Sequence, residues 1–222
     1  MPTAREPIVC YVTGRKSLGA DASPLDLAVR MRTAIAAGAD WVQIREKDLP
    51  AREVLGLARA AHREAAGRGT LIFVNDRLDV ALAAGAAGVH LGGESLPATD
   101  AIRWCRAGNA PAGFRVGVSC HSVEDVREAE GAGADYVFFG PVFDTPAKRK
   151  FGAPQGIAKL AEVCSSARIP VIAIGGVDAV NAKSCIAAGA AGIAAIRMFQ
   201  EQSDPAKLSA VLTRLRRASA KL

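Results

Sequence analysis

Short apolar runs alternate with longer amphipathic, alanine-rich stretches along the whole chain. The runs lack regular polar alternation, which is typical of parallel strands covered on both faces. They predict eight strands, near residues 8–12, 41–44, 71–74, 88–91, 115–119, 136–140, 170–174 and 192–196. Helical patterns separate most of them, as at residues 25–37, 52–67, 123–131 and 180–188.

A repeat marks the joints between helices and strands. The tripeptide Ala-Gly-Ala followed by a short apolar run occurs four times, at residues 37–45, 84–92, 132–140 and 188–197. Glycine after an alanine-rich helix predicts a left-handed C-cap, and small residues let helix and strand pack closely. At the other end of the helices, Ser122 and Asp178 stand where N-caps are expected.

Eight strands alternating with helices predict an α/β fold, a single (β/α)₈ barrel over residues 1–222. In such a barrel the active site lies at the carboxyl ends of the strands. The alternative is an open doubly wound sheet, which usually has a glycine-rich first turn. The first turn here reads VTGRKSLG and contains no G-x-G-x-x-G motif, so the pattern favours the barrel.

Composition narrows the class of protein. Half of the 222 residues are hydrophobic and 23% are charged, a balance typical of globular proteins rather than disordered ones. No uncharged apolar run reaches about 18 residues and no signal-peptide region is evident, so we expect a cytoplasmic protein with no membrane partner. The net charge is +6, but no basic stretch is interleaved with aromatic residues, so nucleic acid is not expected as a partner. A homo-oligomer is compatible with the sequence.

The five cysteines predict neither a disulfide framework nor a zinc site. Their number is odd and no C-x-x-C motif occurs, so buried free thiols are the default. Cys120 precedes His121, but neighbours on a strand point to opposite faces. A catalytic role for Cys120 is therefore disfavoured.

Cationic residues follow the second predicted strand. Gln43, Arg45 and Lys47 alternate there and are expected to face one way. Two cations on one face need an anion or solvent, since burying them unpaired is costly. Together with Lys148 they are suited to hold a diphosphate. The alternative is a salt-bridged barrel rim.

Two carboxylates, Asp76 and Glu94, follow neighbouring strands. With diphosphate oxygens and water they would complete an octahedral Mg²⁺ site. Asp76 is alternatively a helix cap. The pair Gly175-Gly176 and residues 192–197 follow or form the last two strands, where barrels commonly bind phosphate through backbone N–H groups.

These segments carry a family resemblance. The chain resembles the thiamine-phosphate synthases, which are (β/α)₈ enzymes, from YVTG at residue 11 to AGAAGIAAI at residue 188. The informative segments are VQIREKDL, FVNDRLDVALAAGAAGVHLG, VGVSCHS, ADYVFFGPVFDTPAK and IPVIAIGGV. The same segments resemble the related thiazole tautomerases, which share the fold.

The resemblance implies a role for each matching residue. The segment Gln43, Ile44, Arg45, Glu46 and Lys47 binds the pyrimidine diphosphate, together with Asn75, Ser119 and Lys148. The thiazole phosphate is held by the loop Thr145, Pro146, Ala147 and Lys148, by Gly176, and by Ile196 with Arg197. Mg²⁺ is the implied cofactor, with Asp76, Glu94 and Ser95 as its ligands. Arg45, Lys47, Ser119 and Lys148 are the expected catalytic residues.

This chain departs from the family pattern at several of these positions. Ser95 stands where the family usually has a second aspartate ligand, and Glu94 precedes it. Ala147 replaces a threonine of the phosphate loop, and Arg197 replaces a serine.

Three functions follow from the resemblance. The first is coupling of 4-amino-2-methyl-5-pyrimidinylmethyl diphosphate with a thiazole phosphate, or its carboxylated form, to give thiamine phosphate and diphosphate. It needs positioning and charge stabilisation but no covalent nucleophile. The second is isomerisation of the thiazole phosphate with His121 as acid–base. The third is a non-catalytic phosphate sensor. The intact cation set favours the first.

Overall fold

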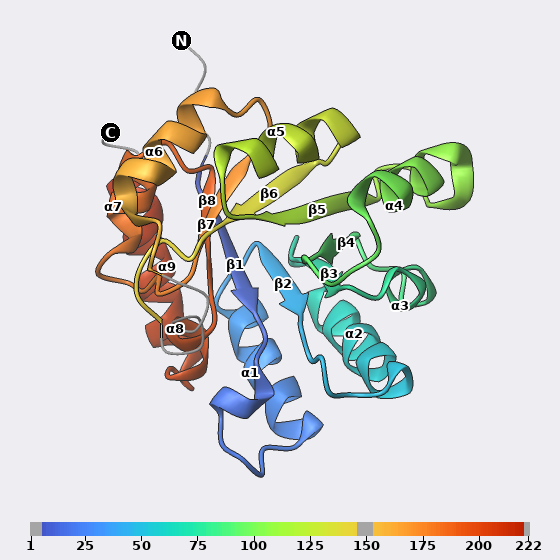
Figure 1. The fold of residues 1–222 in the computed structure, drawn as a ribbon. Coiled ribbons are helices and arrows are strands. Elements are labelled where there is room, and N and C mark those ends of the chain that lie inside the picture. The colour runs from blue at the N-terminus through green and yellow to red at the C-terminus, as the bar shows by residue number, and fades with distance from the viewer. Residues whose placement is uncertain (1–5, 146–152, 220–222) are drawn as a thin grey trace.

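Eight parallel strands form a closed ring in the computed structural model, with the helices outside it (Figure 1). The structure describes residues 6–145 and 153–219, and no helix in these ranges is long and apolar enough to cross a membrane. The strands pair in sequence order and β8 closes on β1, as a (β/α)₈ barrel requires. The strands are β1 (Ile8–Val12), β2 (Trp41–Ile44), β3 (Leu71–Asn75), β4 (Gly88–Leu91), β5 (Arg115–Cys120), β6 (Tyr136–Phe139), β7 (Val171–Ile174) and β8 (Gly192–Ala195).

The helices cover the outer face of this ring. The longer ones are α1 (Pro24–Ala36), α2 (Ala51–Ala65), α5 (Val123–Ala132), α6 (Gly156–Ser166) and α9 (Pro205–Ser219). The shorter ones are α3 (Leu78–Ala83), α4 (Ala98–Trp104), α7 (Ala182–Ala187) and α8 (Arg197–Gln200). Two brief turns complete the described elements, the 3₁₀ turn η1 (Arg15–Ser17) and the π-helical turn η2 (Cys105–Asn109).

The Ala-Gly-Ala repeat forms the same joint each time. Gly38, Gly85, Gly133 and Gly189 all have φ between +65° and +95°, which confirms the predicted left-handed C-caps. At the start of α5, Ser122 accepts from the Asp125 N–H and Asp125 accepts from the Ser122 N–H, so Ser122 is the predicted N-cap. Asp178 accepts from the Val180 and Asn181 N–H groups at 2.8 and 2.9 Å, just before α7.

Aromatic rings fill the half of the barrel interior that lies toward the amino-terminal ends of the strands. The ring centroids of Trp41, Phe73 and Tyr136 lie 4.8 to 5.6 Å apart, and all three side chains are buried. Gly117 makes room for them, because a Cβ there would lie 2.1 Å from Cζ of Tyr136. Packed rings at these distances leave the barrel closed at this end.

A polar layer lies directly above these rings. Side chains alternate along a strand, so the residue two places after an inward-facing one also faces inward. Two places after Trp41 and Phe73 come Gln43 and Asn75, and two places after Gly88 and Gly117 come His90 and Ser119. The barrel therefore changes from apolar to polar toward the carboxyl ends of its strands.

Candidate functional site

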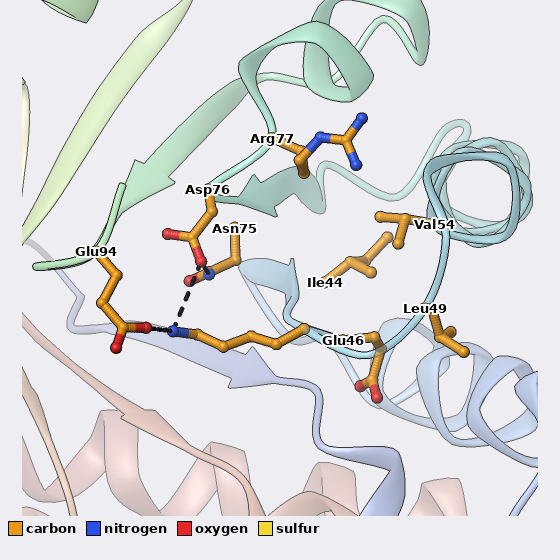
Figure 2. A pocket seen from close by; sticks show the side chains of 9 residues that line it. Ile44, Glu46, Leu49, Val54, Asn75, Asp76, Arg77 and Glu94 are labelled. Atoms are coloured by element: carbon orange, nitrogen blue, oxygen red, sulfur yellow. Dashed lines mark hydrogen bonds and ion pairs between the residues drawn. The ribbon is translucent and has the colours of Figure 1, made fainter. Parts of the chain in front are cut away.

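An open pocket of about 230 Å³ lies at the carboxyl ends of β2 and β3. Figure 2 shows the polar Glu94, Asp76 and Asn75 on one side and the apolar Ile44, Leu49 and Val54 on the other. Lys47 and Arg77 also line it, although Arg77 pairs with Asp79 at 2.6 Å. Ile44, expected to bind substrate, is 1% exposed and belongs to the core between barrel and helices.

The end of β2 differs from the predicted pattern. Gln43, Arg45 and Lys47 do not alternate along one strand, because β2 ends at Ile44 and Lys47 lies in the following turn. This break coincides with a hydrogen bond to Thr13, the residue that follows β1. The Arg45 N–H donates to Oγ1 of Thr13 at 2.8 Å, so the chain turns toward the end of β1.

Glu46 is part of the same break and turns away from Asp76 (Figure 2). Its buried carboxylate accepts from Oγ1 of Thr13 at 2.7 Å and from the Arg15 N–H at 3.1 Å. Burial raises the pKa of the Glu46 carboxyl, and the bonds from Thr13 and Arg15 partly offset this. Through these bonds Glu46 anchors the segment 45–47 to the end of β1.

Gln43, Asn75 and Asp76 form a chain of hydrogen bonds across β2 and β3. Gln43 Nε2 donates to Asn75 Oδ1 at 2.8 Å, and Asn75 Nδ2 donates to Asp76 Oδ2 at 2.6 Å. These two bonds orient both amides, with Nδ2 of Asn75 toward Asp76 and Oδ1 of Asn75 toward Gln43. Gln43 Oε1 is left buried with no hydrogen-bond partner among the described residues.

Asp76 is held in an unusual backbone conformation. Its φ is +61°, the only positive value at a non-glycine position in the part of the chain that the structure describes. Its N–H donates to the His90 carbonyl at 2.8 Å, which ties the end of β3 to β4. Strained conformations of this kind collect at functional sites.

The metal ligands implied by the resemblance lie around Asp76. The Ser95 hydroxyl donates to Asp76 Oδ1, and Ser95 Oγ accepts from the Gly92 N–H at 2.7 Å. Glu94 is turned to Lys47, whose Nζ lies 3.1 Å from Glu94 Oε2 and 3.9 Å from Asp76 Oδ2 (Figure 2). Within residues 6–145 and 153–219, no three His, Cys, Asp or Glu side chains converge as a metal cluster.

These oxygens nevertheless fit Mg²⁺. This ion commonly takes one or two carboxylates and completes its shell with water and substrate phosphate oxygens. Asp76 and Ser95 supply a carboxylate and a hydroxyl side by side, at the edge of an open pocket. The side chain of Glu94 is 89% exposed and, apart from its ion pair with Lys47, is open to solvent.

His90 and Ser119 lie inside the mouth of the barrel. His90 Nε2 lies 2.9 Å from Ser119 Oγ, and His90 Nδ1 lies 3.3 Å from the Tyr136 hydroxyl. Burial lowers the pKa of His90 to about 3, while the nearby charges of Asp76 and Arg45 act in opposite directions. His90 is thus a neutral, hydrogen-bonded residue of the interior.

His121 is exposed directly after the end of β5. Its Nδ1 is hydrogen-bonded to the Gly140 carbonyl, and its N–H donates to Asp125 at 2.6 Å. Cys120 points into the core between barrel and helices, and burial raises its pKa to about 12. The two side chains do not cooperate, in agreement with the expectation that Cys120 is not a nucleophile.

The described residues expected to hold the thiazole phosphate follow β6, β7 and β8. Gly176 has φ +67°, and a Cβ there would lie 2.7 Å from the Asp144 carbonyl oxygen. The loop after β6 therefore crosses directly over the glycine pair, and the half-buried Thr145 follows the crossing residue Asp144. Pro146, Ala147 and Lys148 lie outside the described residues. Ile196 and the exposed Arg197 follow β8, so Arg197 begins α8 rather than ending a strand.

Sequence reasoning gave no site role to Thr13, Arg15 or Tyr136. Thr13 and Arg15 support the cationic segment, and Tyr136 contacts His90 from below. A threonine directly after an apolar strand was the available signal for Thr13. Tyr136 had no comparable signal, because a tyrosine in an apolar strand usually indicates core.

Comparisons with known proteins identify the family of the chain. The sequence profile of the thiamine monophosphate synthase family matches residues 9–199. A putative thiamine-phosphate synthase from Geobacter sulfurreducens is 44% identical over 190 residues, 86% of this chain and 87% of the relative. A thiamine-phosphate synthase from Methanoculleus marisnigri is 42% identical over 194 residues, 87% and 88% of the two chains. The solved thiamine phosphate pyrophosphorylase from Pyrococcus furiosus superposes with a TM-score of 0.79 at 33% identity, over 94% and 95% of the two chains.

Proposed function

The chain belongs to the thiamine monophosphate synthase family, and we propose that the two sides of its barrel mouth bind the two substrates of that reaction. The enzyme is a transferase of thiamine biosynthesis. It joins 4-amino-2-methyl-5-pyrimidinylmethyl diphosphate to a thiazole phosphate and releases thiamine phosphate and diphosphate.

One observation carries the assignment of the two sides. Gln43, Lys47, Asn75 and Asp76 are connected by hydrogen bonds and an ion pair at the ends of β2 and β3. The loop after β6 crosses over Gly176 at Phe143 and Asp144, and Thr145 is the next residue of that loop. The polar layer lies between them, so a pyrimidine diphosphate on the first side and a thiazole phosphate on the second would meet over it.

The first side supplies charge to the leaving group. The bond between the pyrimidine methylene and its diphosphate oxygen breaks, and the electron pair leaves with the diphosphate. Lys47 and Arg45, with Lys148 by resemblance, place positive charge where this negative charge develops. A bound Mg²⁺ would add further positive charge to the same oxygens.

The protein's second task is positioning. The thiazole nitrogen attacks the methylene carbon, and the new carbon–nitrogen bond completes thiamine phosphate. Gln43, Asn75 and Ser119 orient the pyrimidine, while Gly176 and Thr145 hold the thiazole phosphate. Holding two reactants in line accounts for a large part of such a rate enhancement.

Incubating the purified chain with both substrates and Mg²⁺ tests the proposal directly. We expect thiamine phosphate to appear, and expect none after omission of either substrate or addition of a chelator. Parallel reactions with the thiazole phosphate and its carboxylated form identify the accepted substrate. Isomerisation of the thiazole without coupling would instead support the tautomerase function, and binding without turnover would support a sensor.

A further inference from the structure

The buried contact below Ser119 extends the proposed site by two residues. Ser119 is half-buried at the mouth, while His90 and Tyr136 beneath it are each 1% exposed. The Ser119, His90 and Tyr136 side chains form one line, with distances of 2.9 and 3.3 Å. The order of donors along this line decides what Ser119 can offer to a ligand.

Tyr136 determines which groups donate along this line of hydrogen bonds. Its hydroxyl lies among aromatic rings, and His90 Nδ1 is its only hydrogen-bond partner in the part of the chain that the structure describes. A buried donor without an acceptor is costlier than an acceptor with a spare lone pair. The phenol therefore donates to His90 Nδ1, which must be unprotonated.

The proton donated by Tyr136 determines which ring nitrogen of His90 is protonated. A neutral imidazole carries one N–H, so an unprotonated Nδ1 places it on Nε2. An imidazolium is disfavoured because His90 is buried and has only hydroxyl partners. The Nε2–H therefore donates to Ser119 Oγ, which leaves the hydroxyl proton of Ser119 free.

We propose that Tyr136 and His90 are positioning residues that fix the Ser119 hydroxyl as a hydrogen-bond donor toward the pyrimidine substrate. A pyrimidine ring nitrogen has a lone pair that accepts such a bond. This inference rests on the proposed function for the identity of the ligand, but the donor order belongs to the free protein. Specificity follows, because a ring lacking that nitrogen would leave the donor unpaired.

Nitrogen NMR of the free protein tests the donor order without any assay of activity. The chain has three histidines, so ¹⁵N-histidine spectra of wild type, His62→Gln and His121→Asn assign the His90 signals by elimination. We expect a protonated Nε2 and an unprotonated Nδ1. A proton on Nδ1 in the wild-type protein would overturn the proposal, whether or not the chain couples the two substrates.

Kinetics with a matched control test the consequence. Tyr136→Phe removes one buried hydroxyl, and we expect KM for the pyrimidine diphosphate to rise about threefold to tenfold with kcat within about twofold. Tyr11→Phe is the control, since Tyr11 is equally buried but bonds to Gln200 on the other side of the β1 wall. We expect it to leave KM unchanged.

A double-mutant cycle separates the relay from a general loss of packing. In a Ser119→Ala background the hydroxyl is absent, so Tyr136→Phe should have no further effect on KM. Equal effects of Tyr136→Phe with and without Ser119 would overturn the relay. If wild type shows no coupling at all, the proposed function fails, and the NMR result still decides the donor order.

Discussion

The Lys47 ammonium lies between two carboxylates at the barrel mouth, 3.1 Å from Glu94 Oε2 and 3.9 Å from Asp76 Oδ2. The ion pair with Glu94 joins the loop after β2 to the loop after β4. In the proposed function, a diphosphate would compete with the two carboxylates for Lys47, and its Mg²⁺ would compete with Lys47 for the carboxylates. The roles of Asp76 and Glu94 can therefore be tested by substituting each carboxylate in turn.

We expect Asp76→Asn to abolish Mg²⁺-dependent coupling and Glu94→Gln to weaken it, because a hard cation requires carboxylate oxygens. Initial rates over a Mg²⁺ titration measure both effects. Asp100→Asn, an exposed carboxylate paired with Arg103 on α4, is the control. If the Glu94→Gln titration coincides with that of wild type, Glu94 is not a metal ligand, and the ligand oxygens come from Asp76 and Ser95.

Arg45→Ala is expected to lower kcat by about a hundredfold or more while leaving the fold intact, since one charged donor to a leaving group contributes a few kcal/mol. Arg63→Ala on the exposed face of α2 provides the matched loss of a guanidinium. The same loss of activity is expected for Lys148→Ala. Normal turnover by folded Arg45→Ala would contradict the diphosphate assignment.

His121→Asn distinguishes coupling from isomerisation. Coupling proceeds by charge separation, so we expect the variant to keep at least about a tenth of the activity. Isomerisation by proton transfer would lose about a hundredfold to ten-thousandfold. Both reactions are assayed on wild type and variant. A wild type that isomerises but does not couple, and that depends on His121, would show that the chain is a tautomerase.

Gly176→Ala is expected to raise KM for the thiazole phosphate by about tenfold or more, equivalent to about 1.4 kcal/mol of binding. The substituted Cβ would press on Asp144 and Phe143, at 2.7 and 2.8 Å. Gly69→Ala is the control, since its φ is +77° and nothing lies within 4 Å of its Cβ. Gly69→Ala should lose about 1–2 kcal/mol of unfolding free energy from backbone strain, and Gly176→Ala should lose more because its Cβ also clashes. Unchanged KM in Gly176→Ala would remove this loop from the site.

Alkylation at pH 8 should leave coupling activity intact. Burial raises the pKa of the thiols of Cys120 and Cys185 to about 12 and that of Cys164 to about 11. The reactive thiolate becomes abundant only as pH approaches those values, so reaction should accelerate toward pH 11. Mass spectrometry of labelled peptides locates the sites. Rapid inactivation with label on Cys120 would contradict the buried position of this thiol.

The barrel could be predicted from the sequence because each of its units repeats one physical pattern. The eight predicted strands agree with the observed ones within about one residue at most ends, and the Ala-Gly-Ala joints have the expected left-handed glycines. These features are local. Burial on both faces makes a strand apolar throughout, and a helix followed at once by a strand needs a glycine.

The site was predicted less completely, because its details depend on contacts between distant residues. The end of β2 is set by Thr13, which lies 32 residues before Arg45, so extending the strand alternation to Lys47 was wrong. The hydrogen bond between Ser95 and Asp76 joins two loops 19 residues apart. Only the closed ring makes such pairs neighbours.

The packed rings of Trp41, Phe73 and Tyr136 close one end of the barrel, so its interior opens only at the carboxyl ends of the strands. A ligand bound over the polar layer would enter and leave past the rim that carries Lys47 and Gly176. If two ligands were bound there, one seated against His90 would leave only after the one nearer the rim. In a site that opens at one end, product release can limit turnover as much as the chemical step does.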